Sequence, residues 1–300
     1  MLDHWPRPVR RTLFRVLGVD WSEHLLERAW RHGEGDLHAM LDYLFRRNDF
    51  ELSTQQAELL EAYPNCIIAG NHPHGLFDGL ALAWLASANR HPTRVMARHF
   101  LQVFKPLREV FLSVTLDAQR RASSGAAYKA AADWLNQGHR LVITPAAGLS
   151  QARPFWGEAM DPPWRSGVVR LARETGKPIV LVEVGMPSSP TRQLLHRLHP
   201  IVRALAQVWA YRLGKRQRIS LNIKAVIKPE DLPVELSLTE QTTWLQQQLS
   251  SGHCRLGLAT SPITRYQQSA DQVPNTPEGS DQHHAAQLRE ETKDDDQTKA

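Results

Sequence analysis

The chain has 300 residues, of which 42% are hydrophobic, and it carries a formal net charge of +5 at pH 7. This length predicts one large domain or two small ones with a sizeable core. No run of about 18 apolar residues occurs, so the sequence gives no support for a transmembrane helix. The N-terminus lacks an apolar signal region, and the two cysteines do not indicate a disulfide framework. We therefore expect a protein of the reducing cytosol.

The charge is distributed unevenly along the chain. Residues 271–300 hold eight acidic and three basic side chains, so the other 270 residues carry a net charge of +10. Residues 191–229 contain nine Lys or Arg and no Asp or Glu. A basic body attracts anionic partners such as nucleic acid, a phospholipid surface or a phosphorylated substrate. Charge alone does not choose among these partners.

The elements predicted in chain order begin with helices. Residues 1–53 are predicted to form an N-terminal helical segment, with Ser22 and Asp36 as candidate N-caps, and residues 54–61 to form a short helix. Strands then alternate with helices; we expect strands at 66–69, 93–97, 114–116, 141–144 and 179–184, and helices at 79–86, 124–135 and 167–175. This alternation predicts an α/β fold whose central, mostly parallel mixed sheet is flanked by helices.

The last part of the chain changes character twice. Apolar and polar residues alternate from Ile219 to Ile227, which predicts a strand with one wet face near the sheet edge. A helix at 238–249 follows. Beyond residue 262 the chain is polar, acidic and nearly free of aromatic residues, which predicts disorder. We therefore divide the chain into a helical segment (1–53), a catalytic domain (54–262) and a disordered acidic tail (263–300).

Two histidines and a carboxylate lie on one predicted strand-to-helix turn. His72 and His74 follow the apolar run at 66–69, and Asp78 opens the next helix. A neutral imidazole is the usual general base near neutral pH, and a carboxylate orients it best. The dipole of the helix favours a negative charge on Asp78. His72 and Asp78 would together deprotonate a hydroxyl for attack on an activated acyl group, although Asp78 as a plain N-cap is the simpler alternative.

Two other interpretations of these residues remain open. His74 and Asp78 are four residues apart and form a rival pair, against which Pro73 and Gly75 argue because they disfavour helix there. Alternatively His72, His74 and Asp78 would ligate a cation in a metal-dependent hydrolase. The remaining histidines form no spaced second cluster, so we expect no metal.

The segment from Asn71 to Gly79 resembles the first conserved block of the glycerolipid and lysophospholipid acyltransferases. In the commonest form of that block four residues separate His from Asp, whereas five separate His72 from Asp78. This variant looks like the bacterial hemolysin-related branch, which reads Asn-His-Pro, four residues, Asp-Gly. Residues 144–150 are similar to that branch's Phe-Pro-Ala-Gly-Glu-Val-Ser block, and 161–172 with 178–180 to its continuation. The resemblance covers roughly residues 50–190.

The resemblance implies an O-acyltransferase with His72 as general base and Asp78 as its orienting partner. The donor would be a thioester on coenzyme A or acyl carrier protein, the acceptor a lysophospholipid or related glycerolipid hydroxyl, and no metal or other cofactor is needed. Substrate binding would involve Asn71, Pro145 and Ser150. Gly148 stands where the family carries Glu, which leaves the acceptor open. Residues 72–75 also look like the diacylglycerol and wax-ester acyltransferase signature, so a neutral acceptor remains possible.

The basic residues suggest how the substrate and the membrane would be bound. Arg98, just past a predicted strand, would pair with a phosphate or else be a solvated cation, and Arg170 is expected to be structural. The basic region 192–228 fits an anionic leaflet. We expect a bacterial peripheral enzyme at the inner face of the cytoplasmic membrane that binds no nucleic acid. The alternative is a catalytically inactive, membrane-binding acyltransferase-like protein.

Overall fold

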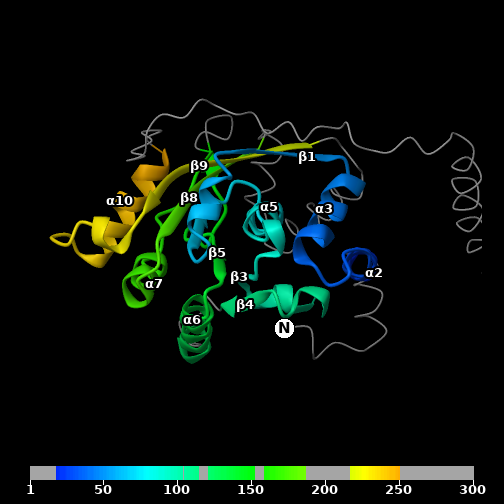
Figure 1. The fold of residues 1–300 in the computed structure, drawn as a ribbon, viewed down its shortest axis with the longest axis horizontal. Coiled ribbons are helices and arrows are strands. Elements are labelled where there is room, and N and C mark those ends of the chain that lie inside the picture. The colour runs from blue at the N-terminus through cyan, green and yellow to red at the C-terminus, as the bar shows by residue number, and fades with distance from the viewer. Residues whose placement is uncertain (1–17, 104, 115–120, 153–158, 187–216, 251–300) are drawn as a thin grey trace, which may run out of the picture. The chain divides into compact units, whose positions relative to one another are not determined.

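A computed structural model describes residues 18–103, 105–114, 121–152, 159–186 and 217–250. They belong to one compact unit, Met1–Pro262, built on a seven-stranded sheet with the order β1-β9-β8-β2-β5-β3-β4 (Figure 1). Its strands are β1 (Phe50–Gln55), β2 (Ile67–Gly70), β3 (Thr93–Arg98), β4 (Phe111–Val114), β5 (Arg140–Ile143), β8 (Ile179–Gly185) and β9 (Gln217–Ile227). Every neighbouring pair is parallel except β8 and β9. The predicted fold class, a mostly parallel mixed sheet flanked by helices, is confirmed.

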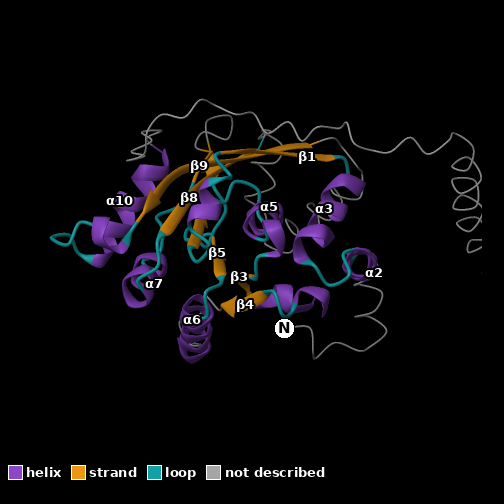
Figure 2. Ribbon diagram, viewed as in Figure 1, coloured by secondary structure: helices purple, strands orange, loops and turns teal. Residues whose placement is uncertain are grey.

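Helices cover both faces of this sheet (Figure 2). One face packs against α2 (Val19–His32), α3 (Leu37–Arg47) and α5 (Leu76–Ala86), and the other against α6 (Arg121–Asn136), α7 (Gly167–Thr175) and α10 (Leu238–Ser250). Along β2, Ile68 points into the first core while Ile67 and Ala69 point into the second. Because β2 is buried on both faces, its sequence is a continuous apolar run rather than an alternating one.

Smaller elements complete the described part of the chain. They are α4 (Leu59–Ala62), four 3₁₀ turns, and a separate antiparallel pair of short strands, β6 (Gln151–Ala152) and β7 (Ala159–Met160). The 3₁₀ turns are η1 (Ala88–Arg90), η2 (His99–Val103), η3 (Lys105–Leu107) and η5 (Pro229–Asp231).

Several sequence predictions are confirmed to within two residues. The strands expected at 93–97, 141–144, 179–184 and 219–227 and the helices expected at 167–175 and 238–249 are all present. Asp36 caps α3, and its carboxylate accepts a hydrogen bond of 2.8 Å from the backbone N–H of Ala39. Strand β9 is second from the edge and pairs on both sides, with β8 and with β1.

Three local predictions were wrong. Helix α2 begins at Val19, and Ser22 lies inside it and donates its hydroxyl to the carbonyl of Gly18 at 2.9 Å. The helix expected at 54–61 is limited to Leu59–Ala62, because strand β1 occupies residues 50–55. Helix α6 begins at residue 121 rather than 124. Of the strand expected at 114–116, residue 114 ends β4, and residues 115 and 116 lie outside the described part of the chain.

Strand β1 also crosses the expected division at residue 53. It pairs in parallel with β9, from Phe50 opposite Gln217 to Gln55 opposite Asn222. Residues 50–55 form a strand only because they pair with residues about 167 positions later in the sequence. Such contacts easily override local propensity. Residues 1–17 of the predicted helical segment, most of the basic region 192–228 and the acidic tail 263–300 lie outside the described residues.

Candidate active site

The candidate site is the loop between β2 and α5, at the carboxyl end of the central strand. Ligands bind at this edge in open α/β sheets. Gly75 directly precedes α5 and has a φ of +110°, a backbone conformation that residues with a Cβ rarely adopt. Gly70, at the end of β2, lies so close to α5 that a Cβ there would approach the side chain of Leu82 to 2.8 Å. These two glycines allow the loop to turn tightly from the strand into the helix.

Asp78 and His72 face each other across this loop. Asp78 is fully buried, and its Oδ2 accepts hydrogen bonds of 2.7 Å from the backbone N–H groups of both His74 and Gly75. The same Oδ2 lies 3.2 Å from Nδ1 of His72, whose side chain is 19% exposed. Asp78 is therefore an acceptor at the N-terminus of α5 and also the partner of the imidazole. With Nδ1 turned to the carboxylate, Nε2 of His72 is left for another group.

The His72–Asp78 contact is close without being a fully aligned hydrogen bond. Nδ1 of His72 and Oδ1 of Asp78 are both buried and make no aligned hydrogen bond within the described part of the chain. Catalytic contacts are often loose in the absence of substrate and tighten when it binds.

His74 occupies a different environment. It is only 2% exposed, and its ring packs against Phe77 with a centroid separation of 5.0 Å. Its backbone N–H belongs to the set of donors that hold Asp78. Of the two histidines, His72 is the more accessible to a substrate.

Asn71 attaches the loop to the neighbouring strand β8. Its side-chain amide donates to the carbonyl of Val184 at 3.1 Å and accepts from the N–H of the same residue at 2.6 Å. Both polar groups of the amide are thereby engaged with backbone. These two contacts hold the loop against β8, and substrate binding by Asn71 stays a prediction.

The predicted residues after β5 are brought to the same edge of the sheet. Ser150 is buried, its N–H donates to the carbonyl of His72 at 2.8 Å, and its hydroxyl donates to Asp161 at 2.5 Å. Pro145 is buried, and its carbonyl accepts from the N–H of Arg165 at 3.0 Å. These contacts of Ser150 and Pro145 fasten the loop after β5 to neighbouring segments of the chain, and their binding of substrate stays a prediction.

Arg98 ends β3 and is exposed. Its guanidinium donates to the carbonyl of Ala147 at 2.8 Å, and Ala147 has a φ of +53°. The side chain thus reaches across to the loop after β5 and holds a residue with an unfavourable backbone conformation. A Cβ at Gly148 would meet Pro162 at 3.5 Å, an ordinary contact, so packing does not require glycine where related proteins carry Glu.

Asp161 is a site residue that the sequence reasoning did not single out. Its Oδ1 accepts from the backbone N–H of His72 at 3.0 Å as well as from Ser150, and its Oδ2 accepts from the indole N–H of Trp164 at 2.9 Å. The side chain of Gln246, on α10, bonds the backbone of residues 161, 162 and 164. The sequence offered a signal in Asp-Pro-Pro-Trp, but it did not show that this segment contacts a loop 89 residues away.

The described residues include neither a candidate metal cluster nor a candidate membrane-spanning helix. No group of three or more His, Cys, Asp and Glu side chains is arranged there to hold a metal ion. In the same part of the chain, no helix combines the length and the apolar character needed to cross a membrane.

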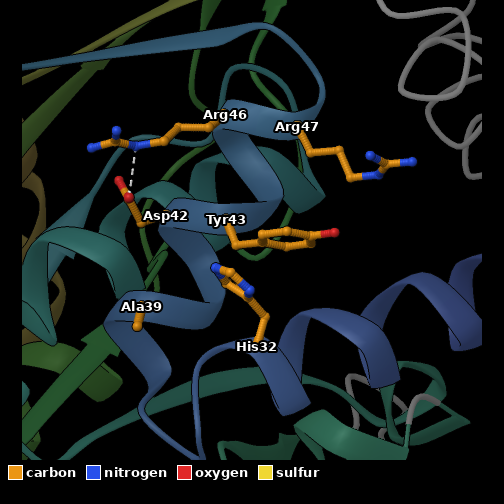
Figure 3. Close-up of a pocket in the computed structure, with 6 residues that line it drawn as sticks. All are labelled: His32, Ala39, Asp42, Tyr43, Arg46 and Arg47. Carbon is orange, nitrogen blue, oxygen red and sulfur yellow. Dashed lines mark ion pairs between the residues drawn. The ribbon is translucent and has the colours of Figure 1, made fainter. Parts of the chain in front are cut away.

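A pocket lies between α2 and α3, and none of the loop residues lines it (Figure 3). It is open and has a volume of about 580 Å³; its lining residues are His32, Ala39, Asp42, Tyr43, Arg46 and Arg47. Arg46 forms a 2.7 Å ion pair with Asp42, and the rings of His32 and Tyr43 lie 4.4 Å apart. The imidazole of this pocket, His32, lies against Tyr43, and its carboxylate, Asp42, pairs with Arg46. We therefore place the chemistry at the β2–α5 loop, where an imidazole and a carboxylate face each other.

Comparison with known proteins shows the family of this chain. The acyltransferase family model matches residues 2–206, so the chain belongs to the acyltransferase family. Among solved structures, it is similar to the 1-acyl-sn-glycerophosphate acyltransferase PlsC from Thermotoga maritima, with 14% identity and a TM-score of 0.47. The match covers 80% of this chain and 92% of that one. No curated protein matches the chain.

Proposed function

We propose that this acyltransferase moves a fatty acyl group from a thioester to a hydroxyl of a lysophospholipid or related glycerolipid. The observation that carries the proposal is the partly exposed imidazole of His72 at 3.2 Å from the buried carboxylate of Asp78. Membership of the acyltransferase family makes acyl transfer the reaction that such a pair would serve. The acceptor class rests on the resemblance of the motifs around Asn71 and Ser150.

The proposed reaction is a single addition and elimination at the thioester carbonyl. Nε2 of His72 takes the proton from the acceptor hydroxyl while the oxygen attacks the carbonyl carbon. The tetrahedral intermediate collapses, the carbon–sulfur bond breaks, and the leaving thiolate takes the proton from the imidazolium. Asp78 would hold Nδ1 and stabilise the positive charge that forms on the ring. The donor would be acyl-CoA or acyl carrier protein, and no metal takes part.

The enzyme would meet its lipid acceptor at an anionic membrane surface on the cytoplasmic side. The support is the net charge of +10 outside the last thirty residues. Within the basic region 192–228, the described cations Arg218, Lys224 and Lys228 already form ion pairs with Glu51, Glu183 and Glu230. Residues 217–228 are therefore less suited to lipid contact than the sequence suggested. Flotation with vesicles containing phosphatidylglycerol, compared with phosphatidylcholine alone, tests the proposal, and salt should weaken binding.

The test of the reaction is release of free thiol by purified protein. Acyl-CoA and acyl carrier protein thioesters are each offered with a panel of lysophospholipids and diacylglycerol. We expect His72→Ala to lower turnover by about 10²- to 10⁴-fold, the usual contribution of a general base. The matched control is His24→Ala, which removes a histidine whose side chain is 79% exposed and pairs only weakly with Glu27. Its turnover should equal that of the wild type.

Three outcomes would change the proposal. Equal turnover in wild type and His72→Ala would remove His72 as the base, and loss of turnover in His74→Ala instead would assign it to His74. Transfer to diacylglycerol alone would replace the lysophospholipid by a neutral acceptor. No turnover with any pair would favour an inactive member of the family.

A further inference from the structure

We propose that Asp161 is a positioning residue for His72, which it holds through the backbone rather than through the imidazole. This inference rests on the proposed function of His72 as the base. The N–H of His72 donates to Oδ1 of Asp161 at 3.0 Å, and the carbonyl of His72 accepts from the N–H of Ser150 at 2.8 Å. Both backbone polar groups of the base are therefore fixed, and neither contact belongs to the β2–α5 turn itself.

Both oxygens of the Asp161 carboxylate accept hydrogen bonds, and the donors come from three different segments. Oδ1 accepts from His72 and from the hydroxyl of Ser150, which is 1% exposed, and Oδ2 accepts from the indole of Trp164, which is 6% exposed. Hydrogen bonds to a charged acceptor are about twice as strong as neutral ones. Asp161 thus fixes the loop after β2 to the loop after β5.

The position of Asp161 is set in turn from the second core. Trp164 is buried among the residues that pack on α7 and α10, and its backbone N–H donates to the side chain of Gln246 at 3.1 Å. The same Gln246 amide donates to the carbonyls of Asp161 and Pro162 at 3.4 and 3.3 Å. The base is therefore held from both sides of the sheet, by Asp78 on α5 and by Asp161, which α10 supports.

Two carboxylates thus act on one histidine in different ways. Asp78 faces the ring and orients the nitrogen that it contacts. Asp161 fixes the main chain from which the ring extends. A displacement of about 1 Å at a catalytic group can cost about 10²-fold in rate, so both contacts matter for the reaction.

The geometry supplies a rescue experiment. In Asp161→Asn, the amide oxygen can keep the contacts of Oδ1, but the NH₂ group then faces the indole N–H of Trp164, donor against donor. Trp164→Phe removes that indole N–H. We therefore expect the double variant Asp161→Asn/Trp164→Phe to recover turnover relative to Asp161→Asn alone, which a simple loss of packing cannot produce.

The experiment measures kcat and KM for the thioester, melting temperature, and the backbone amide proton shift of His72 by NMR. For Asp161→Ala we expect kcat to fall by about 10²-fold with KM within about twofold, because the base moves and the donor site does not. The amide proton of His72 should shift upfield as its hydrogen bond is lost. The control is Asp231→Ala, which removes another carboxylate that accepts a backbone N–H, that of Lys228 at 3.2 Å, in an exposed turn. All three readouts should stay unchanged there.

The inference is overturned if Asp161→Ala keeps kcat within about twofold of an active wild type, or if the His72 amide shift does not move. It is also overturned if the double variant is no faster than Asp161→Asn. If Asp161→Ala does not fold, the comparison of Asp161→Asn with the double variant decides. Failure of the proposed function looks different, because then the wild type itself shows no turnover dependent on His72, while the amide shift still reports whether Asp161 holds that residue.

Discussion

A buried charged side chain lies at each end of helix α5, and only one of the two faces a group that a substrate can reach. At the N-terminus, Asp78 accepts from the backbone of His74 and Gly75 and faces the partly exposed ring of His72. At the C-terminus, the Arg140 guanidinium donates to the carbonyl of Ala86 at 2.9 Å. A negative charge at the first turn and a positive charge at the last both suit the helix dipole.

The partners of the two charges explain their different roles. Arg140 is 4% exposed, and its two terminal guanidinium nitrogens donate to the main-chain carbonyls of Ala86 and of Leu60 in α4, the latter at 2.6 Å. Burial lowers the pKa of Arg140 from its ordinary value, but a guanidinium remains charged at neutral pH. Because neither of these two carbonyl groups can exchange a proton, the role of Arg140 is to fix helix ends. Asp78 instead faces the partly exposed imidazole of His72, a group that can accept a proton.

The largest effect that would test this contrast is expected at the site. In Asp78→Asn, the amide oxygen can keep the two backbone hydrogen bonds of Oδ2, but the charge that faces His72 is lost. We expect turnover to fall by about 10⁴-fold, as in other enzymes that lose the carboxylate partner of a histidine base. The NH₂ group at the Oδ1 position gains no acceptor, which costs about 1–3 kcal/mol of stability. Thiol release and a thermal melt measure both, with Asp42→Asn, at a partly exposed carboxylate outside the β2–α5 loop, as the control. A loss of less than tenfold would contradict the role of Asp78.

The opposite pattern is expected at Arg140. In Arg140→Met, the carbonyls of Ala86 and Leu60 lose their buried donor, at a cost of about 1–3 kcal/mol each. Urea unfolding should show this loss, while kcat of the folded protein stays within about twofold. The control is Arg90→Ala, because Arg90 is 80% exposed in its ion pair with Asp36. A collapse of kcat at a temperature where Arg140→Met is folded would show that the two ends of α5 are coupled.

A similar contrast exists at the two ends of strand β2. The loop after it carries His72, whereas the thiol just before it, Cys66, is expected to be unreactive. Burial raises the pKa of Cys66 to about 12, while the nearby charge of Arg140 acts in the opposite direction. We expect this thiol to react with a disulfide reagent at pH 8 at least about 10³-fold more slowly than in the unfolded chain, because the thiolate is the nucleophile. The measurement uses Cys254→Ser to leave one thiol, and fast reaction in the native state would contradict the burial.

The raised pKa of Cys66 also predicts how stability depends on pH. The unfolded thiol loses its proton near its ordinary pKa of about 8.5, whereas the folded one keeps it until about 12. The contribution of Cys66 to stability is therefore fully present below about pH 8.5 and is lost as the pH rises toward 12. Urea unfolding of the Cys254→Ser and Cys66→Ala/Cys254→Ser proteins at pH 7 and pH 10 should show the difference.

The smallest effect is expected for Arg170, whose charge lies at neither end of helix α5. The guanidinium of Arg170, on α7, lies 4.7 Å from the centre of the Tyr128 ring, whose hydroxyl donates to Glu174 at 2.8 Å. Burial and Glu174 raise the pKa of Tyr128 above its ordinary value. Arg170→Ala should lower the free energy of unfolding by about 0.5–1 kcal/mol, the usual value of an exposed cation–π contact, without changing kcat. A tenfold loss of turnover would instead place Arg170 in the site.

Much of the fold could be predicted because its signals are local. The strands at 93–98, 140–143 and 179–185 are short apolar runs between turn residues, and the helix at 167–175 ends at a glycine in the left-handed conformation. Strand β1 could not be predicted in this way. Its six residues become a strand only by pairing with β9, and their own sequence does not outweigh the helix signal that follows.

The candidate site, like the fold, could be predicted only where its signals are local. The spacing of His72 and Asp78 on one turn was sufficient to predict that they meet, because a tight turn between a strand and a helix brings such residues together. The roles of Asn71 and Ser150 were not predictable, since their partners Val184 and Asp161 lie on other segments. The sequence by itself determined the α/β class, the acyltransferase motif and its histidine–carboxylate pair. The tertiary structure alone decided which groups hold that pair in place, because hydrogen bonds between distant segments exist only once the sheet has brought its loops to one edge.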